Sequence, residues 1–128
     1  MKFSELPTTT SGNRKLTVEN GVIESTRLTT ADHGLLSGWL FLKFGSGGCG
    51  FGGYALGKAE GGNLSGKERD YAAEFVVRCL NAAGVSDWEN LEGKPLRVLH
   101  EGLGGGIVAI GHFLKDEWFC PRIEWEKK

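Results

Sequence analysis

The segment Leu35–Phe44 has the clearest alternation of side chains in the sequence. One side carries the apolar residues Leu36, Leu40, Leu42 and Phe44, with Gly38 among them. The opposite side carries Trp39 and Phe41 between polar residues. Because successive side chains of a strand point to opposite faces, the pattern predicts a strand that is largely apolar on both sides. Such a strand is typical of the middle of a sheet.

Several other segments have the composition of strands. Lys15–Asn20 and Val22–Thr30 flank Asn20-Gly21, a dipeptide typical of tight hairpin turns, and predict two short strands joined at that point. The remaining predicted strands are Phe51–Leu56, Leu96–His100 and Gly106–Leu114. Between these groups of strands, the apolar residues recur every three or four positions instead of every second position, which indicates a helix.

The predicted helix has a start signal, an apolar stripe and a stop signal. Ser65 and Glu68 match the capping-box pattern, in which each side chain satisfies a free backbone amide. From Tyr71 to Ala83 the apolar residues recur every three or four positions and form one stripe. Gly84 is typical of the residue that ends a helix.

Strands before and after one helix predict an α+β fold. We expect an antiparallel sheet of about five or six strands with one main helix packed on one face. Residues 1–14, rich in Thr, Ser and Gly, are expected to form a flexible N-terminal arm. Residues 15–128 are expected to form a single domain, which is the size that a chain of 128 residues favours.

Charge and cysteine content narrow the class of protein. The chain has 15 basic and 16 acidic residues, and this balance argues against sequence-independent nucleic-acid binding, which needs clustered Lys and Arg. Three cysteines far apart favour reduced thiols over a disulfide framework. No apolar run has the length of a signal peptide or a membrane span. We therefore expect a cytoplasmic protein with no membrane partner, cofactor or metal.

Glycine is in excess, with 21 residues, and nine of them lie among the eighteen residues 45–62. Gly48–Gly53 matches the dinucleotide pattern GxGxxG, but the following residues look extended, whereas that fingerprint requires a helix. Gly52–Lys58 begins like a phosphate-binding loop, but Ala59 stands where Ser or Thr would hold magnesium. Both matches are better explained by glycines at a corner of the sheet.

Cysteine and histidine supply the candidates for catalysis. Cys49 would be a nucleophile if His33, His100 or His112 lay beside it, so a Cys-dependent enzyme is one hypothesis. Cys79 falls on the apolar stripe of the helix and is expected in the core. The spacing typical of a zinc site does not occur. No group in the sequence forms a coherent catalytic set.

The aromatic residues are more numerous than one helix and one sheet face require. Most are expected in the core. Trp39 and Phe41, on the outer side of the strongest strand, are expected to form an exposed patch that binds a partner or joins two copies of the chain. The residues predicted to contact a partner are Trp39, Phe41, Cys49, Phe51 and Tyr54.

The block Ile110-Gly111-His112, followed by Trp118-Phe119-Cys120-Pro121, is the most specific part of a wider resemblance. With Gly50–Tyr54 and the segment 93–98, it resembles a family of small uncharacterised proteins encoded by bacteriophages and prophages. The resemblance implies a phage accessory protein acting in the bacterial cytoplasm, and it transfers no catalytic residue. By analogy with other small phage proteins, we expect a non-enzymatic binding protein that inhibits a bacterial defence system, most plausibly a CRISPR effector.

A second hypothesis is a small-molecule binder, such as a sponge for a nucleotide signal. Glycine-rich backbone cradles phosphate through its amides, and Arg or His side chains add charge-assisted hydrogen bonds. The residues predicted for this site are Gly48, Gly50, Arg97, Gly104, Gly105 and His112.

Overall fold

A computed structural model describes residues 1–9, 14–32, 34–45, 47–54, 56–58, 71–102 and 106–125. The elements are η1 (Phe3–Glu5), β1 (Thr17–Asp32), β2 (Leu35–Phe44), β3 (Gly47–Gly52), β4 (Gly57–Lys58), α1 (Tyr71–Ala83), η2 (Trp88–Asn90), β5 (Pro95–His100), β6 (Ile107–Gly111), β7 (Trp118–Phe119) and α2 (Pro121–Glu124). The predicted capping box at Ser65 and Glu68 lies outside the described residues.

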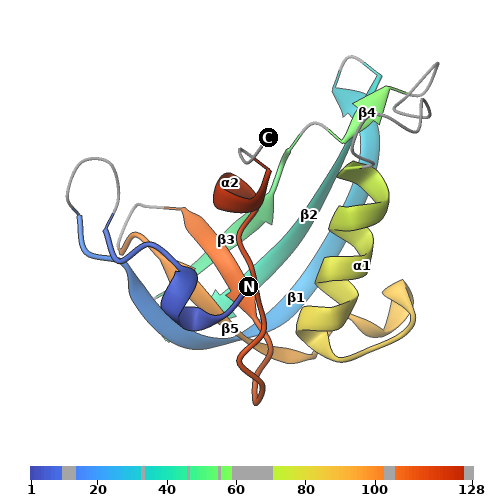
Figure 1. Cartoon of the computed structure of the whole chain (residues 1–128). Helices are drawn as coiled ribbons and strands as arrows, with labels where there is room; N and C mark the ends of the chain where they lie inside the picture. The colour runs from blue at the N-terminus through green and yellow to red at the C-terminus, as the bar shows by residue number, and fades with distance from the viewer. Residues whose placement is uncertain are drawn as a thin grey trace.

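The strands form one antiparallel sheet with α1 against one side (Figure 1). Within the described part of the chain, the strand order is β3-β2-β1-β5-β6-β7, and the short β4 pairs with the start of β2. Every pairing is antiparallel. The predicted α+β fold, an antiparallel sheet with one main helix, is therefore confirmed.

The predicted hairpin at Asn20-Gly21 is wrong, because β1 runs through this dipeptide as one continuous strand. The first part of β1 pairs with β5, where Thr17 faces His100. The second part pairs with β2, where Gly21 faces Phe44. Ladder hydrogen bonds on both sides of the strand outweigh the local preference of Asn-Gly for a turn.

The predicted strand Leu35–Phe44 is confirmed with the same bounds. Leu40 and Leu42 are buried on the side that faces α1, and Phe41 is exposed on the other side. The predicted strand Phe51–Leu56 is displaced toward the N-terminus, since β3 covers Gly47–Gly52. Gly50 lies inside this strand, where the Trp39 ring of the partner strand β2 covers its backbone.

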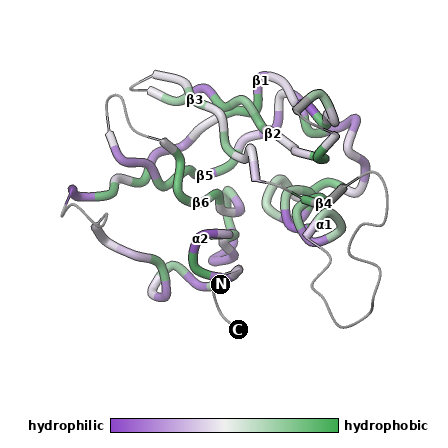
Figure 2. Tube along the Cα trace, turned by 90° about the horizontal axis from the view of Figure 1, so that it is seen from above, coloured by the Kyte–Doolittle hydropathy of each residue, from purple (hydrophilic) through white to green (hydrophobic). Residues whose placement is uncertain are grey.

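The main core lies between α1 and the inner face of the sheet. Phe51 of β3, Phe75 of α1 and Phe119 of β7 form its aromatic centre, with ring centroids 5.9 to 6.1 Å apart. The sheet curves so that β3 approaches β6, and Figure 2 shows the hydrophobic β6 within the molecule. Cys79 is buried in this core, as its place on the stripe predicts.

A second, smaller core lies on the opposite face of the sheet, at the end formed by β5, β6 and β7. Leu6 of the N-terminal segment and Leu16 pack there with Leu99, Val108 and Trp118. Residues 1–9, the first part of the expected N-terminal arm, lie against the sheet (Figure 1). The N-terminal segment covers this end of the outer face and leaves the β1–β3 end free of it.

Helix α1 ends as predicted at Gly84, whose φ of +72° is the left-handed conformation typical of a helix C-terminus. Arg78 of α1 forms an ion pair with Glu124 of α2, with 2.6 Å between Nη1 and Oε1. A second guanidinium nitrogen of Arg78 donates to the carbonyl oxygen of Trp118 at 2.7 Å. These bonds fix the C-terminal segment beside the main helix.

Candidate binding face

The side of β1, β2 and β3 that points away from α1 is called the outer face. The register places Arg27 beside Trp39 and Val22 beside Lys43, and all four residues point to this side. On the inner side, the position of a Cβ on Gly38 would lie 2.7 Å from Cε2 of Phe75, so α1 packs directly against the sheet there. The sheet thus has one face covered by the helix and one that carries exposed aromatic residues.

Trp39 and Phe41 form a stacked pair on the outer face. Their ring centroids are 5.9 Å apart, and the two planes differ by 7°. Phe41 is 37% exposed, and Trp39 is half-buried. An aromatic pair of this kind contributes packing energy beyond simple area burial, so the rings hold each other in place while remaining accessible.

The Trp39 indole packs directly against glycine backbone. A Cβ on Gly50 would lie 2.8 Å from Cε3 of the indole, and a Cβ on Gly53 would lie 2.4 Å from Cζ2. Gly53 also has a φ of +76°, a conformation that side-chain-bearing residues rarely adopt. Gly50 and Gly53 therefore let the indole lie directly on the backbone.

Two grooves flank the aromatic pair. The upper groove, of about 370 Å³, is lined by Arg27, Thr29, Ala31, Leu35, Ser37, Trp39 and Gly53. The lower groove, of about 520 Å³, is lined by Asn20, Gly21, Val22, Lys43, Phe44, Gly45, Pro95 and Phe113. The lower groove is the more apolar of the two, since Val22 and Phe113 are both exposed within it.

Three of the five predicted partner-binding residues lie away from the outer face. Phe51 is fully buried in the main core and cannot contact a partner directly. Cys49 and Tyr54 are half-buried and pack against the same core. Cys49 and Phe51 pair with Leu42 and Leu40 of β2, so the alternation of β3 turns them inward, and only Trp39 and Phe41 of the predicted set share the outer face.

Val22, Arg27 and Phe113 line the grooves and are not among the site residues predicted from the sequence. Val22 and Arg27 could be predicted to lie on the outer face if β1 were recognised as one strand, because its register with β2 places them beside Lys43 and Trp39. Phe113 lies in the loop after β6 and reaches the face only through the tertiary fold. No sequence pattern marks it.

The residues predicted for the nucleotide sponge are divided between strands that do not pair with each other. Gly48 and Gly50 lie on β3, whereas Arg97 lies on β5, with β2 and β1 between them. Arg97 donates from Nε to the carbonyl oxygen of His112 at 2.9 Å and from Nη2 to that of Lys115 at 2.7 Å. These bonds use its guanidinium to hold the loop. Gly104 and Gly105 lie outside the described residues.

His112 has an internal role as well. Its Nδ1 accepts hydrogen bonds from the backbone amides of Leu114 and Lys115, each at 3.0 Å. The ring therefore fixes the turn between β6 and β7. Together with Arg97, it organises the loop that presents Phe113 at the lower groove.

His100 is the one buried histidine among the described residues. Its Nε2 lies 2.5 Å from Oε2 of Glu19, and its Nδ1 accepts a hydrogen bond from the amide of Gly102 at 3.0 Å. The ring stacks on Phe44 with 4.8 Å between centroids. Both ring nitrogens have partners within the protein, so His100 ties β5 to β1 and has no nitrogen left to activate a nucleophile.

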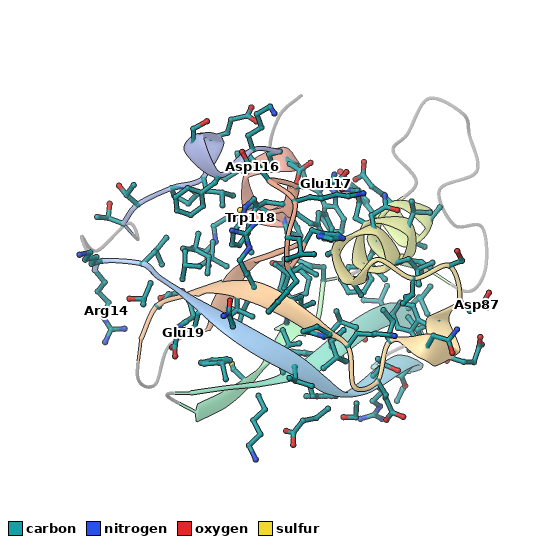
Figure 3. All side chains as sticks on the ribbon, turned by 90° about the horizontal axis from the view of Figure 1, so that it is seen from below. Arg14, Glu19, Asp87, Asp116, Glu117 and Trp118 are labelled. Carbon is teal, nitrogen blue, oxygen red and sulfur yellow. The ribbon has the colours of Figure 1, made fainter. Side chains whose placement is uncertain are left out.

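The described thiols and carboxylates considered next do not form a group of side chains that could act together in catalysis or metal binding. Burial raises the pKa of Cys79 well above its usual range and also raises that of Cys120, which keeps both thiols neutral. Figure 3 shows Asp116 and Glu117 beside Trp118, with Asp87 at the far side of the molecule. No cluster of three or more potential metal ligands occurs among the residues that the structure describes.

These features define an α+β domain with a helix-covered inner face and an aromatic, grooved outer face. Comparison with protein-family models, with curated proteins and with solved structures finds no match. Among the described helices, none has the length and apolar character needed to cross a membrane.

Proposed function

We propose that this chain is a non-enzymatic binding protein whose outer face docks on a partner protein. The stacked pair of Trp39 and Phe41 carries this proposal. Tryptophan and other aromatic residues dominate the binding energy of many interfaces. Because the indole already rests on Gly50 and Gly53, it loses little conformational freedom when a partner covers it.

The surroundings of the pair support apolar, shape-led recognition. Val22 and Phe113 extend the apolar surface into the lower groove, at 43% and 39% exposure. Exposed apolar residues gathered around a groove are typical of interaction sites. The net charge of −1 for the whole chain indicates that association does not depend on strong charge attraction.

The resemblance to phage-encoded proteins directs the choice of partner. The proposed partner is an effector of a bacterial defence system, with CRISPR effectors first, and the chain inhibits it in the bacterial cytoplasm by covering a functional surface. Inhibition of this kind needs no catalytic group on the inhibitor. The internal hydrogen bonds of His100 and His112 support this non-enzymatic role.

The test measures binding of the purified chain to a panel of purified CRISPR effectors by biolayer interferometry, together with nucleic-acid cleavage by each effector. We expect one effector to bind and to be inhibited. Trp39→Ala and Phe41→Ala are each expected to weaken that binding by about tenfold or more and to restore cleavage. Circular dichroism checks that both variants remain folded.

Val77→Ala is the matched control, because Val77 is an exposed apolar residue of α1, on the other side of the sheet. It is expected to bind and inhibit like the wild type. If both aromatic variants bind as tightly as the wild type, the outer face is not the interface. If no effector is bound or inhibited, the proposed class of partner is wrong.

A further inference from the structure

The upper groove differs in chemistry from the rest of the outer face. Its walls combine a cation, a planar aromatic ring, two hydroxyl groups and short aliphatic side chains, contributed by Arg27, Thr29, Ala31, Leu35, Ser37, Trp39 and Gly53. None of these residues is acidic. Most of these residues belong to the second half of β1 and the first half of β2. Figure 1 shows these segments, and the start of β2 pairs with β4.

Arg27 gives the groove its charge. It is exposed, it lies directly across from Trp39 in the register, and no described residue forms a hydrogen bond or ion pair with it. By contrast, Arg78 and Arg97 have partners within the protein: Arg78 forms an ion pair with Glu124, and Arg97 donates hydrogen bonds to backbone carbonyl oxygens. None of the described lining residues carries a carboxylate beside this guanidinium. A guanidinium in such surroundings favours an anionic occupant, and its planar fork suits phosphate.

The hydroxyl groups and the indole indicate which other chemical groups the bound molecule carries. Thr29 and Ser37 face each other across β1 and β2. The Thr29 oxygen accepts a hydrogen bond from the amide of Ala31 at 3.0 Å, which leaves its own proton free to donate. Trp39 forms one wall, and a planar aromatic ring is the surface on which nucleic-acid bases stack.

We propose that the upper groove binds one nucleotide unit. The base stacks on Trp39, the phosphate binds Arg27, and the hydroxyls of Thr29 and Ser37 bind the sugar or the phosphate. A volume of about 370 Å³ lies at the lower end of the range of small-molecule sites, which suits a single nucleotide. The site uses other residues than the predicted glycine-rich one, and it goes beyond the proposed protein binding.

The test titrates the isotopically labelled chain with AMP, GMP, CMP and UMP and follows backbone amides and the indole N–H of Trp39 by NMR. We expect saturable shifts at Arg27, Ser37 and Trp39 with at least one mononucleotide. Adenosine and inorganic phosphate, each of which lacks half of the recognised chemistry, are expected to bind more weakly. A single-stranded tetranucleotide forms a separate arm: tighter binding of the strand than of any mononucleotide identifies a strand as the source of the nucleotide.

Arg27→Gln is expected to weaken nucleotide binding by about tenfold, the loss typical of a charge-assisted contact. Lys43→Gln removes the same charge from the outer face beyond the aromatic pair and is expected to bind like the wild type. Absence of saturable shifts with every probe, or equal binding by Arg27→Gln and the wild type, would overturn the proposal.

Two variants separate this proposal from the proposed protein binding. Phe41→Ala is expected to lose partner affinity and to keep nucleotide binding, because Phe41 does not line the upper groove. Arg27→Gln is expected to do the reverse. Either proposal can therefore fail while the other stands.

Discussion

At the scale of single residues, glycines determine how closely neighbouring strands approach each other and how closely α1 packs on the sheet. A Cβ on Gly52 would lie 2.1 Å from the carbonyl oxygen of Gly38, and Gly52 has a φ of +128°. Gly38 in turn leaves room for the ring of Phe75 on the inner side. At Gly52, the backbone conformation and a neighbouring backbone carbonyl both exclude a side chain.

Replacing Gly52 by alanine is therefore expected to destabilise the fold by about 3 kcal/mol or more, because the added methyl group meets backbone and the φ is strained. The measurement is urea unfolding at neutral pH. Gly106→Ala is the control, since a Cβ there meets nothing within 4 Å, and it is expected to change the free energy of unfolding by less than about 0.5 kcal/mol. Equal effects of the two substitutions would contradict this account of Gly52.

The role of these glycines could not be predicted from the sequence. A run rich in glycine is equally typical of turns, corners of a sheet and phosphate-binding loops, so its composition does not predict which backbone or ring each glycine contacts. The contact between the Trp39 indole and Gly50 depends on the register of β2 against β3. The periodicity of one strand predicts that Trp39 points outward. It does not predict which residue of the neighbouring strand the indole contacts, because that depends on how the two strands pair.

At the scale of elements, the C-terminal helix α2 is tied to α1 through Glu124. Its carboxylate pairs with Arg78 and accepts a hydrogen bond from the amide of Cys120 at 2.9 Å. Burial acts to raise the pKa of Glu124, but the hydrogen bonds from Arg78 and Cys120 outweigh it, and the pKa lies below its usual range. The ionised form is thus the one that the folded state stabilises.

This shift gives the stability a defined pH dependence. A carboxyl group with a lowered pKa in the folded state stabilises the fold above its unfolded pKa of about 4.3, and the contribution is lost as the pH falls through the folded pKa. Glu124→Gln is expected to lower the free energy of unfolding by about 2 kcal/mol at pH 7. The difference from the wild type is expected to shrink as the pH is lowered toward about 3.

Urea unfolding followed by tryptophan fluorescence at both pH values measures this difference. Glu92→Gln is the control, because Glu92 is exposed in the turn before β5, and we expect it to change the free energy of unfolding little at either pH. A Glu124→Gln effect of the same size at both pH values would show that the carboxylate charge is not what stabilises the C-terminal segment.

The elements themselves were predictable where one pattern dominated. The alternation of Leu35–Phe44 identified β2 with its bounds, and the stripe that ends before Gly84 identified α1. The hairpin at Asn20-Gly21 failed because turn preference is local, whereas β1 is held by two different partners along its length. Pairing with β5, far along the chain, cannot be inferred from residues 15–30 alone.

At the scale of the whole molecule, the aromatic residues are divided between the two faces of one sheet. Phe51, Phe75 and Phe119 build the main core under α1, and Trp118 centres the smaller core under the N-terminal segment. Composition alone predicted that most aromatic residues would be buried, and it could not assign each one to a face. Trp39 and Phe41 remain outside both cores.

This division predicts different energetic costs for the same substitution on the two faces. Phe51→Ala removes a fully buried ring and is expected to lower the free energy of unfolding by about 3 to 5 kcal/mol, through lost burial and the cavity left behind. Phe41→Ala removes a ring that is 37% exposed and is expected to cost about 1 kcal/mol. Urea unfolding of both variants measures the contrast, with the chemical change held constant. Similar costs would mean that Phe41 is a core residue. A small cost at Phe41, combined with lost partner binding, would show that its ring is accessible for recognition and is not needed to hold the sheet together.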